Sequence, residues 1–131
     1  MQPRDVVIVS ACRTAIGKFQ GQFKDVPARE LAITAGKEAI RRAGVDINTI
    51  DEIVMGECYT AMQGSLPARQ VSMRIGLPIE SSAVTVNQNC ASGMRALEIA
   101  CNNIQLGKTE IGLVVGVALM WFLAVPAKVQ S

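Results

Sequence analysis

Residues 84–97 have the sequence VTVNQNCASGMRAL. The β-branched start of this segment is typical of a strand, its polar centre of a turn, and its end of a helix that begins near Cys90. A strand followed at once by a helix is the repeating unit of an α/β fold. The segment therefore predicts an α/β architecture, and it places a thiol at the N-terminal end of a helix.

The same alternation runs along the rest of the chain. We expect strands over residues 5–11, 51–56, 83–86 and 111–115, and helices over residues 27–43, 67–75 and 90–106. Pro27 suits a first helical position, and Gly44 and Gly76 suit helix ends. This order predicts one domain with a mostly parallel sheet covered by helices, the first strand being buried.

The helix expected over residues 90–106 carries only two charged side chains, Arg95 and Glu98. Its expected apolar stripe consists of Met94, Leu97, Cys101 and Ile104. So few charges predict a helix that is buried on most sides.

The composition excludes several classes of protein. The 131 residues are 50% hydrophobic and 18% charged, which excludes a disordered chain. Scattered basic residues, a net charge of +2 and 4% aromatic residues argue against a nucleic-acid partner. Four cysteines without a close Cys-x-x-Cys pair, and no histidine, argue against a metal site. Because residues 1–5 do not resemble a signal peptide, we expect reduced thiols in the cytoplasm.

The C-terminal region is unusually apolar. No charge occurs from Ile111 to Ala127, a run near the lower limit for a membrane span. A strand at the start of this run and Pro126 near its end favour a buried or sticky tail instead. We therefore expect no membrane partner.

Cys90 is the candidate nucleophile. The unpaired backbone N–H groups of a helix N-terminus stabilise a thiolate, which is the reactive form of cysteine. The same groups can hold the negative oxygen that develops on an attacked carbonyl. Residues 91–93 are small and leave room for a substrate. This pattern suits thioester chemistry, and the alternative that Cys90 is one more buried cysteine stays open.

Structural roles are expected for the three other cysteines, Cys12, Cys58 and Cys101. Cys58 also suits the wall of a pocket. In the turn before Cys90, Asn87 and Asn89 either line the turn or cap the helix, and capping is favoured for Asn89. Arg69 either braces a loop or binds an anion, and the sequence leaves both open.

Three motifs, in this order, resemble the thiolase family: residues 11–19 (ACRTAIGKF), 67–70 (PARQ) and 87–96 (NQNCASGMRA). The resemblance extends from Asp5 to about Gly116. It implies an acyltransferase of the acetyl-CoA acetyltransferase type, which moves acyl groups between coenzyme A thioesters. In such an enzyme the cysteine that matches Cys90 is acylated. The resemblance further implies acyl-CoA substrates, a homo-oligomer, and no metal or redox cofactor.

The resemblance also indicates what the chain lacks. The thiolase fold is a duplicated α/β unit, and the missing second half carries the activating histidine and a second cysteine. Residues 1–116 are expected to form the thiolase N-terminal domain, and residues 117–131 an apolar tail that departs from the family pattern. We therefore expect a truncated part of the enzyme with little or no turnover of its own.

Two alternatives remain at this stage. Ketoacyl synthases and related condensing enzymes share the fold and also place a cysteine at a buried helix start, although residues 13–17 and 67–70 favour thiolase. The other alternative is a non-catalytic remnant that associates with itself through its apolar surface.

Overall fold

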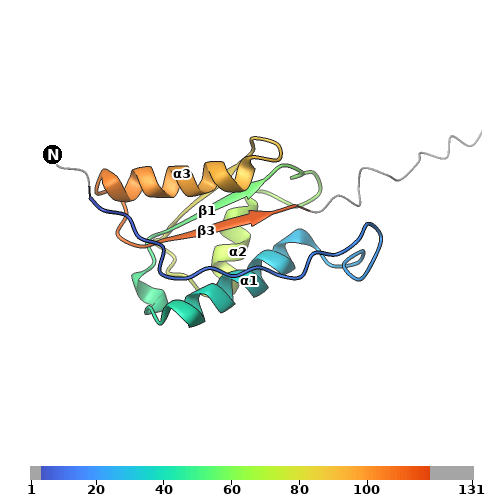
Figure 1. The fold of residues 1–131 in the computed structure, drawn as a ribbon, viewed down its shortest axis with the longest axis horizontal. Helices are drawn as coiled ribbons and strands as arrows, with labels where there is room; N and C mark the ends of the chain where they lie inside the picture. Colours follow the sequence, from blue (N-terminus) through green and yellow to red (C-terminus); the bar gives the residue numbers. More distant parts are fainter. Residues whose placement is uncertain (1–3, 119–131) are drawn as a thin grey trace, which may run out of the picture.

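The computed structural model describes residues 4–118, which form a sheet with helices on both faces (Figure 1). Three parallel strands, β1 (Glu52–Glu57), β2 (Ser82–Val86) and β3 (Gly112–Val117), lie in the order β2-β1-β3. Helix α3 (Ser92–Gln105) covers one face, and α1 (Ala28–Ala43) and α2 (Pro67–Ile75) cover the other. The expected fold class, a parallel sheet covered by helices, is confirmed.

The central strand β1 organises the core, because all six of its residues are buried. Successive side chains of a strand point to opposite faces. Ile53 and Met55 accordingly pack in the cluster formed with α1 and α2, whereas Val54 packs against Ala96 and Ala100 of α3. A parallel strand that is buried on both faces requires an almost uncharged run, as residues 53–56 provide.

Helix boundaries largely follow the sequence signals. Gly44 and Gly76 end α1 and α2 with positive φ angles of 67° and 99°, a conformation that glycine adopts without strain. Pro27 lies at the N-cap of α1, one position before the expected one. A short 3-10 helix, Ile47–Thr49, was not predicted, and the Asp46 side chain caps it by accepting from the Asn48 N–H.

The expected burial of α3 is wrong. Its buried face consists of Ser92, Ala96 and Ala100, and Met94 of the expected stripe is 72% exposed. Leu97, Cys101 and Ile104 are only half-buried. The helix packs against one face of the sheet alone, so a low charge count does not require burial on its other sides.

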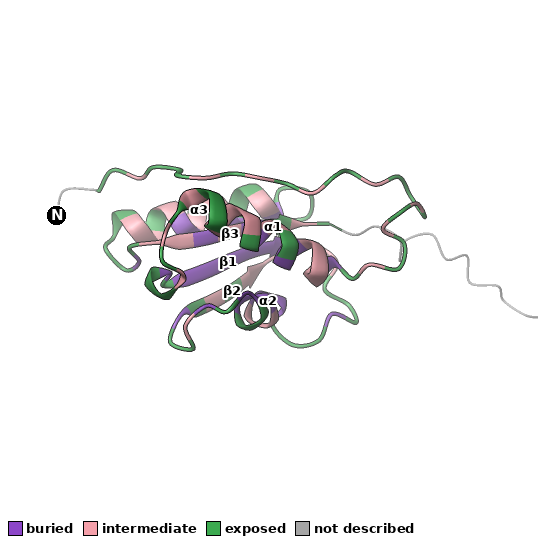
Figure 2. Cartoon of the chain, turned by 90° about the horizontal axis from the view of Figure 1, so that it is seen from below, coloured by how far each residue is buried: buried purple, intermediate pink, exposed green. Residues whose placement is uncertain are grey.

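The strand expected over residues 5–11 is absent, and this prediction is also wrong. The segment has no regular secondary structure, and Val7, Ile8 and Val9 are 75%, 71% and 66% exposed. It runs along the β3 side of the sheet, away from β2 (Figure 2). No strand of the described part of the chain pairs with it, and a β-branched sequence without a partner strand forms no ladder.

A large cavity separates this segment from the sheet. It has a volume of about 1160 Å³ and is lined by residues 5–20, by β3, and by one side each of α1 and α3. Within residues 4–118, β3 pairs with β1 on one edge only, so its other edge faces this cavity. The cavity therefore lies between the two helix layers, next to β3, where a further strand of an α/β/α sandwich would fit.

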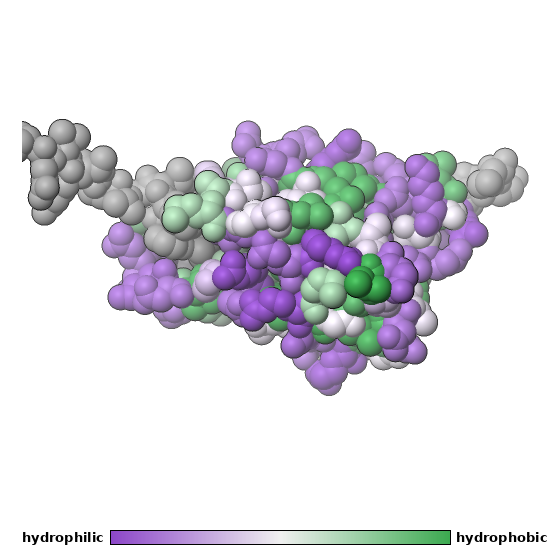
Figure 3. All heavy atoms as spheres, turned by 180° about the vertical axis from the view of Figure 1, so that it is seen from behind, coloured by the Kyte–Doolittle hydropathy of each residue, from purple (hydrophilic) through white to green (hydrophobic). Residues whose placement is uncertain are grey.

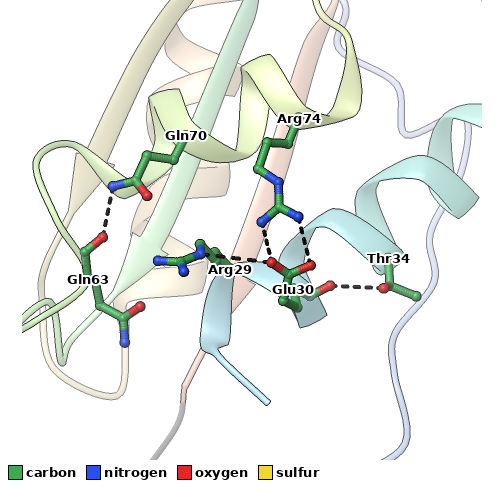
Figure 4. A network of polar contacts seen from close by, with 6 residues as sticks. All are labelled: Arg29, Glu30, Thr34, Gln63, Gln70 and Arg74. Carbon is green, nitrogen blue, oxygen red and sulfur yellow. Dashed lines mark hydrogen bonds and ion pairs between the residues drawn. The ribbon is translucent and has the colours of Figure 1, made fainter. Parts of the chain in front are cut away.

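Polar contacts tie α1 to α2. Arg74 of α2 points toward Glu30 of α1 and forms an ion pair with it (Figure 4). The second contact of this pair, from Arg74 Nη2 to Glu30 Oε2, measures 3.2 Å. Both side chains are partly exposed, so the pair contributes little stability and mainly fixes how the two helices lie.

Within residues 4–118, no helix has the length and apolar character needed to cross a membrane. The apolar tail predicted over residues 117–131 begins with the last residue of β3. From residue 119 onward it lies outside the described residues.

Candidate active site at the start of α3

Cys90 lies in the turn that joins the carboxyl end of β2 to the first residue of α3. It is exposed, whereas the other three cysteines are half-buried. The helix begins two residues later than expected, at Ser92, so Cys90 precedes the helix. Ligands of open α/β sheets bind beyond the carboxyl ends of the parallel strands, and Cys90 stands at that edge.

The turn before α3 is held by two side chains. Asn87 Oδ1 accepts from the Asn89 N–H at 3.0 Å, and Asn87 Nδ2 donates to the Cys58 carbonyl at 3.2 Å. Ser92 Oγ accepts from the Gln88 N–H at 2.9 Å and donates to the Asn89 carbonyl at 2.6 Å. Asn87 thus lines the turn, which is one of the two roles that the sequence left open for it.

Asn89 does not cap the helix, and that prediction is wrong. The N-cap residue is Ala91, which has no side chain able to cap. Asn89 instead takes a left-handed conformation with φ of 50°, which asparagine tolerates better than most residues. Its place in the turn explains why it is asparagine.

Two donors remain open at the start of α3. The Ala91 and Ser92 N–H groups donate back into the turn, to Gln88 and Asn89 carbonyls at 3.1 Å each. The N–H groups of Gly93 and Met94 donate to no acceptor within residues 4–118. These N–H groups belong to the positive end of the helix dipole, which favours negative charge at the start of α3.

Helix α3 starts in direct contact with the sheet. A Cβ atom on Gly56 of β1 would lie 2.2 Å from the Ser92 carbonyl oxygen and 2.6 Å from the Gly93 nitrogen. Any residue other than glycine at position 56 would push the start of α3 away from β1. Gly56 therefore sets the position of the turn that carries Cys90.

The other cysteines do not join Cys90 in a nucleophilic pair. Cys58 follows β1 and is half-buried, and its carbonyl receives the Asn87 amide. Cys12 donates its thiol to the Ala35 carbonyl at 3.1 Å, and Cys101 lines the large cavity. Within residues 4–118, no three His, Cys, Asp or Glu side chains cluster closely enough to hold a metal ion.

Arg69 braces a loop, which decides between the two roles left open by the sequence. Its guanidinium donates to the Ser81 carbonyl at 2.9 Å and to the Ile79 carbonyl at 2.7 Å. The neighbouring Gln70 extends toward Gln63 and donates to its carbonyl at 2.8 Å (Figure 4). The PARQ motif thus anchors the loops on both sides of α2.

Glu57 is a buried carboxyl that sequence reasoning missed. It ends β1, is 2% exposed, and its Oε2 has no hydrogen-bond partner in the described part of the chain. Burial raises the pKa of Glu57 from its ordinary value of 4.5 to about 7. The sequence did carry a signal for it. Residues 53, 55 and 57 of a strand share one face, so a carboxyl at position 57 lies on the same face as two apolar residues.

Comparison with known proteins gives one consistent result. A family model described as "Thiolase, N-terminal domain" matches residues 6–126. An acetyl-CoA acetyltransferase of Cupriavidus necator is 47% identical over 107 residues, which are 82% of this chain and 27% of that protein. The chain therefore spans about a quarter of the length of this relative.

Solved structures agree in fold. The acetyl-CoA acetyltransferase of Syntrophomonas wolfei is 55% identical with a TM-score of 0.77, over 79% of this chain and 26% of that chain. The Acat5 thiolase of Ascaris suum, solved in complex with coenzyme A, is 36% identical with a TM-score of 0.80. That match covers 81% of this chain and 28% of the Ascaris protein.

We predict that Gly56→Ala destabilises the domain by about 3 kcal/mol, because the added methyl group overlaps the backbone at Ser92 and Gly93. Urea unfolding measures this loss. Gly112→Ala in β3 is the matched control, since its Cβ would meet the Ala100 Cβ at an ordinary 3.7 Å. Equal stability of the two variants would contradict the close approach.

We predict that Glu57→Gln removes a pH dependence of stability. The folded pKa of about 7 exceeds the ordinary 4.5, so the folded state binds the proton more tightly. The contribution of Glu57 to stability should therefore be greatest below pH 4.5 and fall by up to about 3 kcal/mol as the pH rises to 7 and above.

Urea unfolding over this pH range checks the Glu57 prediction. The Gln variant should be more stable than the wild type at pH 8 and nearly equal to it at pH 4. Glu80→Gln, at an exposed position, should keep the wild-type profile. A Glu57→Gln profile that parallels the wild type would refute the assignment.

Proposed function

Because the chain belongs to the thiolase family and matches its N-terminal domain, we propose that it carries the nucleophilic part of an acetyl-CoA acetyltransferase. The observation that carries the proposal is the exposed Cys90 thiol in the turn directly before α3, a helix whose Gly93 and Met94 N–H groups have no acceptor within residues 4–118. The relatives named above are thiolases or acetyl-CoA acetyltransferases, so we favour this activity over that of a ketoacyl synthase.

In the proposed step the Cys90 thiolate attacks the carbonyl carbon of an acyl-CoA thioester. A bond forms between Cys90 Sγ and the acyl carbon, and the bond from that carbon to the coenzyme A sulfur breaks. Coenzyme A leaves as the thiol once it has taken up the proton that Cys90 released. Backbone N–H groups near Cys90 stabilise the oxygen that becomes negative during the attack.

Turnover requires a base that this chain does not contain. Histidine is the usual base that activates a nucleophilic cysteine, and the 131 residues include none. We therefore propose that acylation by this chain alone is slow and that repeated cycles do not occur. The chain spans only about a quarter of the length of its relatives, and we expect the rest of the machinery from the part it does not span.

Acyl-CoA thioesters are the proposed substrates, with no metal or redox cofactor. The coenzyme A complex of the Ascaris thiolase supports this substrate class. A cytoplasmic location is proposed as well, because all four cysteines are free thiols.

We predict that acetyl-CoA transfers one acetyl group to Cys90, and that intact-mass and peptide mass spectrometry detect it. Cys90→Ser should abolish the modification, because a hydroxyl is a much weaker nucleophile at neutral pH. Cys58→Ser is the matched control and should retain it. Acetylation that persists in Cys90→Ser, or rapid thiolysis of acetoacetyl-CoA by the pure chain, would contradict the proposal.

A second candidate function is self-association without catalysis. The side chains of Val7, Ile8, Val9 and Ile16 are between 66% and 83% exposed, and these residues line the large cavity opposite β3. Apolar side chains also reach the surface on the side of α2 and β2, among hydrophilic ones (Figure 3). Exposed apolar side chains in this number are typical of proteins that bind a partner, and we propose a homo-oligomer.

We predict that the chain sediments as a dimer or larger species at micromolar concentration, as measured by analytical ultracentrifugation. Val7→Lys with Val9→Lys should shift it toward monomer, because charged groups resist burial. Lys substitutions at exposed polar positions, Gln20→Lys with Gln22→Lys, provide the control. A wild-type monomer at all concentrations would exclude self-association.

A further inference from the structure

Two polar side chains bracket the turn that carries Cys90. Asn87 stands before it and bonds to the Asn89 N–H on one side and to the Cys58 carbonyl on the other. Ser92 stands after it and bonds to the Gln88 N–H and to the Asn89 carbonyl. Each side chain therefore makes one bond as acceptor and one as donor.

The turn has few other means of keeping its shape. Asn89 adopts a left-handed conformation, and the N-cap residue Ala91 contributes no side-chain hydrogen bond. Cys90 itself is exposed. The backbone bonds of Ala91 and Ser92 close the turn only when Gln88 and Asn89 keep their orientation, and the two polar side chains hold these residues.

The two side chains are anchored to different parts of the fold. Asn87 connects the turn to the carboxyl end of β1 through Cys58. Ser92 is buried and is the first residue of α3, beside the close contact with Gly56. The turn is thus held between the sheet and the helix, and neither Asn87 nor Ser92 forms a hydrogen bond with the Cys90 thiol in the described structure.

We propose that Asn87 and Ser92 are positioning residues of the nucleophile, which hold the turn that presents the Cys90 thiol at the N-terminal end of α3. This inference rests on the proposed role of Cys90 in acyl transfer. Removing either side chain should slow the reaction of Cys90 strongly and should change the stability of the domain only slightly.

Alkylation kinetics test the proposal in the intact chain. Iodoacetamide is applied at mildly acid pH, and peptide mapping gives separate rates for Cys90 and for the reference thiol Cys58. We expect Ser92→Ala and Asn87→Ala each to lower the Cys90 rate about tenfold, because the thiolate loses its place beside the helix N-terminus. The double variant should fall little further, since both side chains hold one turn.

Conservative variants separate positioning from simple folding defects. Ser92→Thr retains the hydroxyl and should keep the Cys90 rate within about twofold of the wild type. Ser65→Ala and Asn102→Ala are matched controls at exposed positions and should leave the rate unchanged. Urea unfolding of every variant shows whether a lower rate merely follows a lower stability.

Hydrogen exchange distinguishes this proposal from the proposed function. Ser92→Ala should lose protection at the Gln88 amide, and Asn87→Ala at the Asn89 amide, while amides of β1 stay protected. If the wild-type Cys90 reacts no faster than Cys58, the proposed function fails. Exchange at the Gln88 and Asn89 amides then still shows whether Ser92 and Asn87 hold the turn. Unchanged protection together with unchanged Cys90 rates, or a loss of rate that Ser92→Thr does not rescue, would overturn the positioning role.

Discussion

The close backbone approach between β1 and the first turn of α3 is the constraint on which the site depends. Gly56 allows it on one side, and on the other Gly116 of β3 lies so near Gly93 that an added Cβ would be 3.2 Å from the Gly93 Cα. Only five residues separate β2 from α3. Once the helix start is fixed on the sheet, the position of Cys90 is therefore largely determined.

The sequence predicted well those elements whose signal is local. Helix α2 begins and ends where expected, because Pro67 and Gly76 mark its two ends. The first strand could not be predicted in the same way, since β-branched residues favour a strand only when a neighbouring strand offers a ladder. In the described part of the chain, a cavity separates residues 5–11 from the edge of β3. Their β-branched side chains therefore favour a strand that has no neighbour to pair with.

The sequence predicted the place of Cys90 between a strand and a helix, but not the contacts that hold it there. Cys90 follows from the strand-turn-helix order, whereas the bonds of Asn87 and Ser92 depend on a turn whose conformation one sequence does not determine. The two carboxyls of β1 make the same point. Glu52 is buried but accepts from Asn103 at 2.8 and 3.0 Å, whereas Glu57 Oε2 has no partner within residues 4–118. Sequence alone does not tell these two apart.

The cavity beside the N-terminal segment has a consequence for biosynthesis. Residues 5–20 are synthesised before residues 92–117, which supply the α3 and β3 walls of the cavity. At roughly 5–20 residues per second, the interval between residue 20 and residue 117 lasts about 5–20 s. The ion pair between Arg4 and Glu110 can form only after residue 110 has emerged. During this interval the exposed valines and isoleucines of the nascent chain are the natural target for a chaperone that binds extended apolar segments.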